Sequence, residues 1–218
     1  MTKNLSKRIL TSLFLLLILS IIIFFNKYLF LAMLIIISFI SFIEFNNLIK
    51  KSFKKEEKLI IAIQILSVLF FILFAYTSYE IYDRSLISII WFITICILSD
   101  TGGFVIGKLV GGKKLTKISP NKTIAGSIGS FIFSLIPLMF LLQINDIYNN
   151  INLAHLVIIS LLLSTICQAG DLLISYFKRK AKVKDTGSIL PGHGGLLDRI
   201  DGLIFVLPAA HLIDKIIF

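Results

Sequence analysis

The segment LLLSTICQAGDLLISYF, residues 161–177, is apolar along nearly its whole length yet contains one carboxylate, Asp171. A run of this length suits a helix that crosses the bilayer, since about 30 Å of hydrocarbon takes roughly 17–25 helical residues. The rest of the chain has the same character: its 218 residues are 57% hydrophobic and 16% charged, whereas soluble domains contain about 25% charged residues. The sequence therefore predicts an all-α, polytopic membrane protein.

Outward from this segment, seven apolar runs are candidate membrane spans. They comprise residues 9–25, 28–43, 59–76, 85–107, 123–142, 154–174 and 202–218. The first run is interpreted as a retained anchor, because IIIFFNKYLF at 21–30 offers no small-residue cleavage site for a signal peptidase. No repeat or low-complexity linker divides the chain, so we expect one membrane-embedded helical bundle over 1–218.

The distribution of Lys and Arg predicts the orientation of this bundle. All but three of the 22 basic residues fall in segments that share one side of the membrane if the seven spans alternate in direction. The exceptions are Lys27, Arg84 and Lys215. Basic loops are retained on the cytoplasmic side, so we expect a cytoplasmic N-terminus. The net charge of +10 then reflects topology and does not indicate nucleic-acid binding.

One of these basic segments, FNNLIKKSFKKEEKL at 45–59, has apolar residues at helical spacing with lysines between them. It is interpreted either as a helix lying in the cytoplasmic interface or as a solvated loop.

Four carboxylates lie inside apolar runs or directly before one, where a span without a function would not need a charge. Asp100 and Asp171 interrupt predicted spans, and a charge near the bilayer centre costs about 2.5–3.5 kcal/mol on insertion. Asp198 and Asp201 open the last span three residues apart, so they share one helix face. The predicted topology puts all four toward the cytoplasm, where hard oxygen ligands of this kind suit Mg²⁺. The alternatives are a helix-end acid held by a lysine for Asp100 and a buried interhelical contact for Asp171.

Two loops add candidates for phosphate binding. Gly192, Gly194 and Gly195 flank His193 just before a helix, and glycines there let backbone N–H groups approach an anion. In KISPNKTIAGSIGS, residues 117–130, Ser119 and Lys122 precede a span. This second loop is interpreted either as a turn with an N-cap or as a second phosphate clamp.

Two further pairs of residues have structural interpretations. Gly103 and Gly107 form a small-xxx-small pair, which favours close helix packing. Cys96 and Cys167 lie inside predicted spans and are expected to be buried free thiols.

The stretch SYFKRKAKVKDTGSILPGHGGLLDRID, residues 175–201, resembles the signature of the phosphatidate cytidylyltransferases, or CDP-diacylglycerol synthases. GDLLIS at 170–175, SDTGG at 99–103 and KISPNKTIAG at 117–126 are similar to other motifs of that family. The resemblance implies N-terminal helices over 1–84 and a catalytic region over 85–218. Ala125 and the pair Gly103-Phe104 depart from the residues that many relatives carry.

The resemblance implies an integral membrane enzyme that joins phosphatidate to CTP, giving CDP-diacylglycerol and pyrophosphate in phospholipid biosynthesis. The expected partners are CTP, phosphatidate and the lipid bilayer of a bacterial plasma membrane, without nucleic acid, and a homodimer is left open. We expect the active site on the cytoplasmic side, with Mg²⁺ as a single ion or with a second cation beside it. The implied metal ligands are Asp171, Asp198 and Asp201, which are catalytic together with Lys184. The implied substrate ligands are Lys178, Arg179, His193, Gly194, Gly195, Arg199, Ser119, Lys122 and Asp100.

Three other classes of membrane protein are alternatives to this one. A CTP-dependent polyprenol kinase would transfer the γ-phosphoryl group and release CDP. A transporter would be favoured by inverted repeats with acids at the midplane, which the sequence lacks. A CDP-alcohol phosphatidyltransferase would need a spaced Asp-Gly-Ala-Arg motif that is also missing.

Overall fold

The computed structural model describes residues 22, 24, 26–54, 56–144, 152–190 and 194–217. Except for residues 22 and 24, the predicted span 9–25 lies outside these ranges, as does His193. Every regular element within them is a helix, accompanied by two isolated β-bridges. The helices are α2 (Lys27–Ser52), α3 (Glu57–Arg84), α4 (Leu86–Val110), α5 (Ile124–Ser134), α6 (Ile136–Ile144), α8 (Leu153–Lys180), α9 (Leu197–Ile200) and α10 (Leu203–Ile217). The predicted all-α fold is confirmed.

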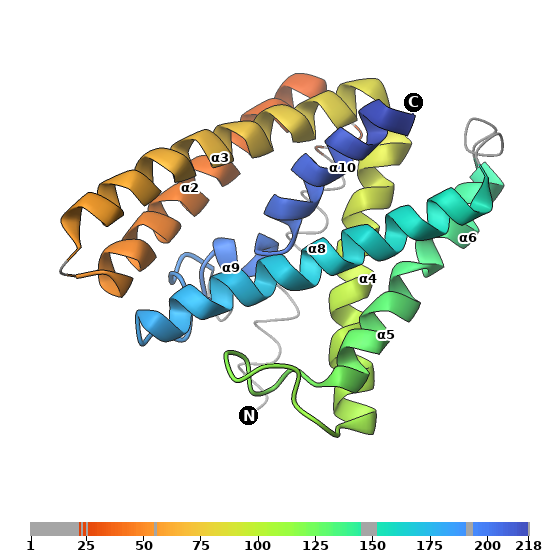
Figure 1. The fold of residues 1–218 in the computed structure, drawn as a ribbon. Coiled ribbons are helices and arrows are strands. Elements are labelled where there is room, and N and C mark those ends of the chain that lie inside the picture. The colour runs from red at the N-terminus through yellow and green to blue at the C-terminus, as the bar shows by residue number, and fades with distance from the viewer. Residues whose placement is uncertain are drawn as a thin grey trace. The chain divides into compact units, whose positions relative to one another are not determined.

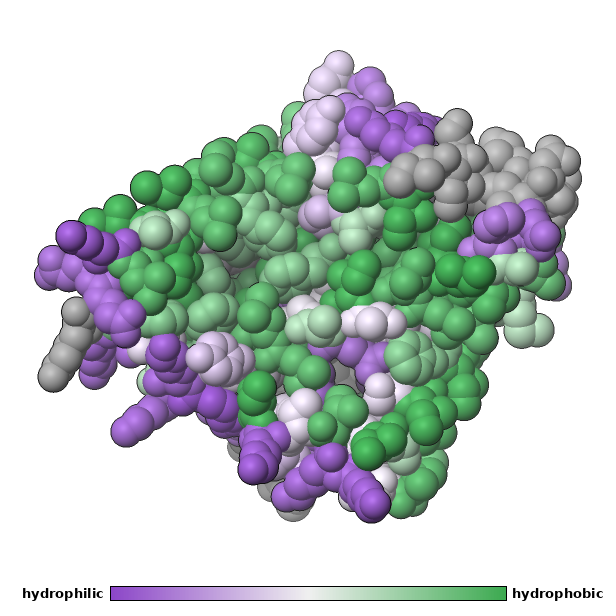
Figure 2. Space-filling model, viewed as in Figure 1, coloured by the Kyte–Doolittle hydropathy of each residue, from purple (hydrophilic) through white to green (hydrophobic). Residues whose placement is uncertain are grey.

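Among the residues that the structure describes, five stretches are long and apolar enough to cross a membrane: α2, α3, α4, Ile124–Gln143 and α8. Large side chains of α3 remain open on its surface, with Ile65, Leu69 and Ile72 each 60% exposed. Figure 2 shows hydrophobic residues over most of the visible face and hydrophilic residues at its margins. Such an apolar exterior is expected of a protein whose solvent is hydrocarbon.

The chain forms two compact units. The first unit comprises Met1–Asp83 and Phe177–Ile200, and the second comprises Arg84–Tyr176 and Asp201–Phe218. In the first, α2 and α3 form the antiparallel pair seen in Figure 1. Lys27 at the start of α2 forms an ion pair with Asp83 near the end of α3 at 3.2 Å. The start of α2 therefore lies beside the end of α3.

The second unit is built around close contact between α4 and α5. A Cβ atom added to Gly102 would lie 2.5 Å from the carbonyl oxygen of Gly129, and one added to Gly126 would lie 2.7 Å from that of Gly103. Small residues let helix backbones approach where lipid provides no hydrophobic driving force. The close packing predicted at Gly103 is thereby confirmed, and Gly107 lies against Gly126 in the same crossing. Cys96 and Cys167 are buried and free, as predicted.

Three predicted segments differ from the observed helices. Residues 45–52 of the segment 45–59 continue α2 to Ser52, and α3 begins at Glu57, so the segment forms neither a separate interfacial helix nor one loop. The run 123–142 is broken at Leu135 between α5 and α6, because Pro137 lacks an N–H and its ring would clash with the preceding turn. The last run forms α10, whose 15 residues span only about 22 Å at 1.5 Å per residue.

Candidate functional site

A pocket of about 310 Å³, lined by both polar and apolar residues, lies in the second unit between α4, α5, α8 and the loop before α5. Four of the predicted site residues line it: Asp100, Ser119, Lys122 and Asp171. Its remaining polar side chains are neutral, so the described pocket contains two carboxylates and one ammonium group. Polar groups converging on a pocket at membrane-embedded helices are expected at a functional site.

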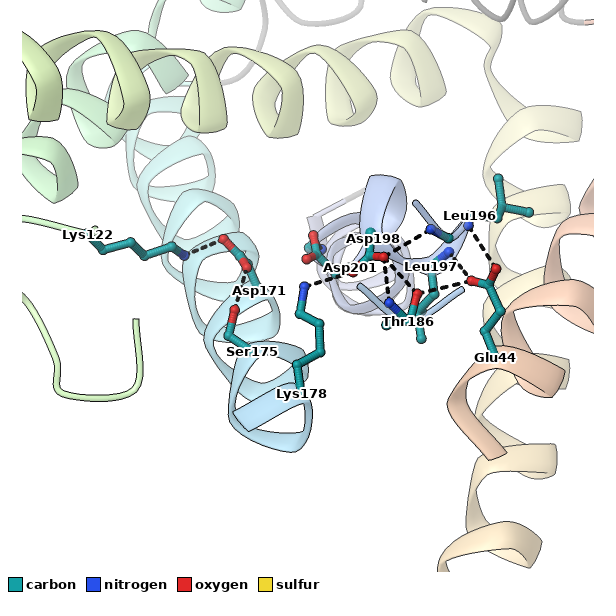
Figure 3. Close-up of polar contacts among 12 residues, drawn as sticks. Glu44, Lys122, Asp171, Ser175, Lys178, Thr186, Leu196, Leu197, Asp198 and Asp201 are labelled. Carbon is teal, nitrogen blue, oxygen red and sulfur yellow. Dashed lines mark hydrogen bonds and ion pairs between the residues drawn. The ribbon is translucent and has the colours of Figure 1, made fainter. Parts of the chain in front are cut away.

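Asp171 is held in this pocket by two partners from different elements. Its Oδ2 atom forms an ion pair with Lys122 Nζ, and its Oδ1 accepts a hydrogen bond of 3.2 Å from Ser175, one turn along α8. Figure 3 shows Lys122 reaching toward α8 from its loop. The side chains of Lys122 and Asp171 are 28% and 25% exposed. Both therefore remain accessible to a ligand that enters the pocket.

Backbone hydrogen bonds shape the loop that carries Lys122. The N–H of Leu115 donates to the carbonyl of Lys122 at 2.8 Å, and the N–H of Lys122 donates to the carbonyl of Ser119 at 3.0 Å. Thr123 then caps α5, accepting from the N–H of Gly126 at 3.0 Å. The N-cap interpretation of this loop is thus confirmed, and the same turn brings Ser119 and Lys122 to the pocket wall.

Gln168, which was not predicted as a functional residue, contributes an amide side chain to this pocket. Gln168 Oε1 accepts a hydrogen bond of 2.6 Å from Ser127 on α5. Its Nε2 lies 3.4 Å from Ser164 Oγ, which in turn lies 2.8 Å from Ser99 Oγ on α4. The available signal was a polar residue inside an apolar run, one turn before Asp171. This chain of hydrogen bonds ties α4, α5 and α8 together around the pocket.

In the first unit, Asp198 is almost completely enclosed by donors. Its Oδ1 accepts from Lys178 Nζ at 2.8 Å, and its side chain is 4% exposed. Its Oδ2 accepts from the N–H of Thr186 at 2.7 Å and from the N–H of Gly195 at 3.1 Å. The Thr186 hydroxyl also lies 3.0 Å from Oδ2. Hydrogen bonds to a charged acceptor are the stronger kind, so Asp198 fastens the end of α8 to the glycine-containing loop.

The surroundings of Asp198 also determine its ionisation. Burial acts to raise the pKa of this carboxyl group, but the hydrogen bonds and charge of its donors outweigh burial. The net effect lowers the pKa of Asp198 below its ordinary value. The group is accordingly an anion at neutral pH.

A second buried carboxylate, Glu44 of α2, was not predicted as a functional residue. Its Oε1 accepts from the N–H of Leu196 at 3.1 Å, and its Oε2 accepts from the N–H of Leu197 at 2.8 Å. Glu44 is 3% exposed, and Figure 3 shows it pointing at the start of α9. Its signal was an acid inside the apolar run SFIEF. Glu44 lies directly after the predicted span 28–43.

The other predicted residues are distributed as follows. Arg179, Lys184 and Arg199 are exposed at the surface of the first unit. Gly194 has φ +87°, a conformation that favours glycine, and its carbonyl accepts from the N–H of Leu190 at 2.9 Å. Asp201 belongs to the second unit, where it is 9% exposed and accepts from the N–H of Gly202 at 2.9 Å.

The carboxylates of the pocket and of the loop around Asp198 differ in how well they suit a metal ion. Within the described ranges, no group of three or more His, Cys, Asp or Glu side chains is placed to hold one. Both oxygens of Asp198 are taken by Lys178 and loop donors, so this arrangement does not fit a metal ligand. The pocket offers Asp100 and Asp171 with amide and hydroxyl oxygens. That set fits Mg²⁺, which usually binds one or two carboxylates together with substrate phosphates.

The comparisons with known proteins agree with one another. Residues 59–217 match the cytidylyltransferase family. A protein of Staphylococcus saprophyticus named phosphatidate cytidylyltransferase is 45% identical over 137 residues, covering 62% of this chain and 52% of the relative. Proteins of the same name from Staphylococcus haemolyticus and Staphylococcus aureus strain COL are 49% and 46% identical. They align over 53% and 62% of this chain and over 44% and 52% of their own lengths.

The chain spans about half the length of the curated relatives it matches. The family match includes the pocket, the end of α8 and the loop around Asp198, whereas Glu44 precedes it. A match over 59–217 covers well over half of the 218 residues. The chain belongs to the cytidylyltransferase family.

Proposed function

We propose that this chain catalyses the transfer of CMP from CTP to phosphatidate, giving CDP-diacylglycerol and pyrophosphate. The names of its relatives support this reaction. The observation that carries the proposal is the pocket of the second unit, where Asp171 and Lys122 meet among helices apolar enough to cross a membrane. A lipid phosphate and a water-soluble nucleotide can meet only where polar groups are available at such helices.

In the proposed reaction, a phosphate oxygen of phosphatidate attacks the α-phosphorus of CTP. A new P–O bond forms, the bond to the β-phosphate bridge breaks, and pyrophosphate leaves with the bonding electron pair. The attacking phosphate is already ionised near pH 7, so little proton transfer is needed. Positioning and charge neutralisation therefore supply most of the catalysis.

The charges of the pocket define what each residue does. Lys122 binds a phosphate group of either substrate, and the Ser119 hydroxyl hydrogen-bonds beside it. Asp100 and Asp171 would repel both anionic substrates if they faced them directly. A divalent cation such as Mg²⁺, held by these two carboxylates, would neutralise the phosphates and the departing pyrophosphate.

The loop of the first unit has a different role in this proposal. Gly194 and Gly195 shape this loop through their hydrogen bonds, and the exposed cations Arg179, Lys184 and Arg199 of the same unit suit the triphosphate of CTP. Lys178 is engaged by Asp198 and holds the loop to α8. We place this loop on the cytoplasmic side of the membrane, as the distribution of basic residues predicts, and the bacterial relatives favour a bacterial plasma membrane.

The test is turnover by the purified full chain in detergent with phosphatidate, CTP and Mg²⁺. Mass spectrometry should detect CDP-diacylglycerol and pyrophosphate in equal amounts. A parallel reaction with a polyprenol in place of phosphatidate should give no product. Phosphorylated polyprenol with CDP would instead identify a kinase, and well-folded protein without turnover would contradict the proposed reaction.

A further inference from the structure

Glu44 is a buried carboxylate whose hydrogen bonds are all made to a segment far away in the sequence. It receives the N–H groups of Leu196 and Leu197 at 3.1 and 2.8 Å. These are the residues that open α9, and the first N–H groups of a helix have no partner within the helix. In most helices, an N-cap side chain directly before the helix accepts hydrogen bonds from these N–H groups. Here Glu44 of α2 is the acceptor.

The backbone around Glu44 is fitted to its side chain. A Cβ atom added to Gly187 would lie 2.3 Å from Glu44 Oε1, and one added to Gly195 would lie 2.6 Å from Glu44 Oε2. Any larger residue at either position would displace the carboxylate. The two glycines therefore leave the space through which the Glu44 side chain of α2 reaches the loop.

Thr186 connects Glu44 to the second carboxylate that holds this loop. Its hydroxyl lies 3.2 Å from Glu44 Oε2 and 3.0 Å from Asp198 Oδ2. Asp198 in turn binds Lys178 and the N–H of Gly195. The loop between α8 and α9 is therefore fastened on one side to α8 and on the other side to α2.

We propose that Glu44 is a positioning residue of the catalytic machinery: by fixing the backbone of residues 195–197 it sets the position of the adjacent, exposed Arg199, a phosphate ligand in the proposed function. This inference rests on the proposed function for the ligand, and it gives α2 a part in the reaction although α2 precedes the family match. Misplacing such supporting contacts reduces activity without removing any group that touches the substrate.

The test compares the full chain with Glu44→Gln and Glu44→Ala in detergent. Glutamine keeps the size of the side chain but removes its charge and one of its two acceptors, and alanine removes both acceptors. Amide hydrogen exchange at Leu196 and Leu197 should accelerate in the order wild type, Gln, Ala. The kcat for CDP-diacylglycerol should fall in the same order, by about 10- to 100-fold in total, while the KM for phosphatidate changes little.

Two controls separate positioning from general destabilisation. Glu57→Gln alters an exposed acid at the start of α3 and should leave both exchange and kcat unchanged. Thr186→Val removes the shared hydroxyl, and its effect on kcat should be less than additive with Glu44→Gln, because both substitutions release the same loop.

The hydrogen-exchange measurement tests the role of Glu44 independently of the proposed reaction. A wild-type chain without turnover would contradict the proposed reaction, whereas exchange at Leu196 and Leu197 would still report on Glu44. Unchanged exchange in Glu44→Gln would overturn the inference. So would accelerated exchange with full kcat, since the loop would then be loosened without consequence for the reaction.

Discussion

The pocket around Asp171 and the loop around Asp198 both combine aspartate with lysine, but the two carboxylates have very different numbers of partners. Asp171 has one ion pair and one long hydroxyl contact, and a quarter of its side chain is exposed. Asp198 has four donors and is 4% exposed. A carboxylate with unused oxygen capacity can bind a ligand, whereas one whose oxygens are filled holds the fold together. The same residue type therefore suits catalysis in one region and architecture in the other.

Replacing Asp171 with Asn should have the largest effect. The substitution keeps the size of the side chain but removes the charge that pairs with Lys122 and, in our proposal, holds the cation. We expect turnover to fall by about 10³-fold or more, as when a group that stabilises transition-state charge is lost. The measurement is CDP-diacylglycerol formation across a range of Mg²⁺ concentrations.

Ser175→Ala is the matched control for Asp171→Asn, because it removes a hydroxyl partner of Asp171 and leaves the charge in place. Turnover should change by no more than a few fold, about the value of one hydrogen bond. Equal losses in the two variants would mean that the geometry of Asp171, and not its charge, is what the reaction needs.

Replacing Asp198 with Asn should have a smaller effect of a different kind. The loop would lose a charged anchor, and we expect turnover to fall by about 10- to 100-fold with no change in the Mg²⁺ concentration needed for half-maximal rate. If turnover instead disappeared and the Mg²⁺ requirement rose, Asp198 would be a metal ligand, as the sequence analysis predicted. The contrast between the two regions would then fail.

The apolar runs predicted most of the fold, because hydrocarbon imposes length and composition on each span. The departures arise where tertiary contacts outweigh that pattern. The helix α2 continues past Ile43, since Glu44, Leu48 and Ile49 are buried by contacts within the first unit. Pro137 was a signal for the break at Leu135, but the run was predicted as one span because the run as a whole is apolar.

The sequence predicted which residues belong to the candidate site, but not which of them form ion pairs with one another. Asp100, Ser119, Lys122 and Asp171 were all chosen from the sequence, and they line one pocket. That Lys122 pairs with Asp171 while Lys178 pairs with Asp198 depends on helix packing, which spacing alone does not specify. Glu44 was missed for the same reason, because its partners lie far away in the sequence and two of them are backbone N–H groups, which leave no trace in the side-chain pattern.

The smallest expected effect is the pH dependence of stability that Asp198 contributes. Because the folded state lowers the pKa of this carboxyl group, folding favours its anion. The contribution is complete above the unfolded pKa of about 3.9 and is lost as the pH falls through the lower folded pKa. At neutral pH, Asp198→Asn should therefore lower the apparent melting temperature, by an amount that reflects about 1.5–3 kcal/mol for hydrogen bonds to a charged group.

Melting curves of wild type and Asp198→Asn in detergent, recorded from pH 7 to pH 3, check this sign. The two melting temperatures should differ by a constant amount down to about pH 4 and converge below it. A difference that stayed constant to pH 3 would mean that the Asn side chain disturbs the loop by its shape and not by its lack of charge. A difference that grew on acidification would contradict the lowered pKa, and with it the view that the donors around Asp198 hold it as a structural anion.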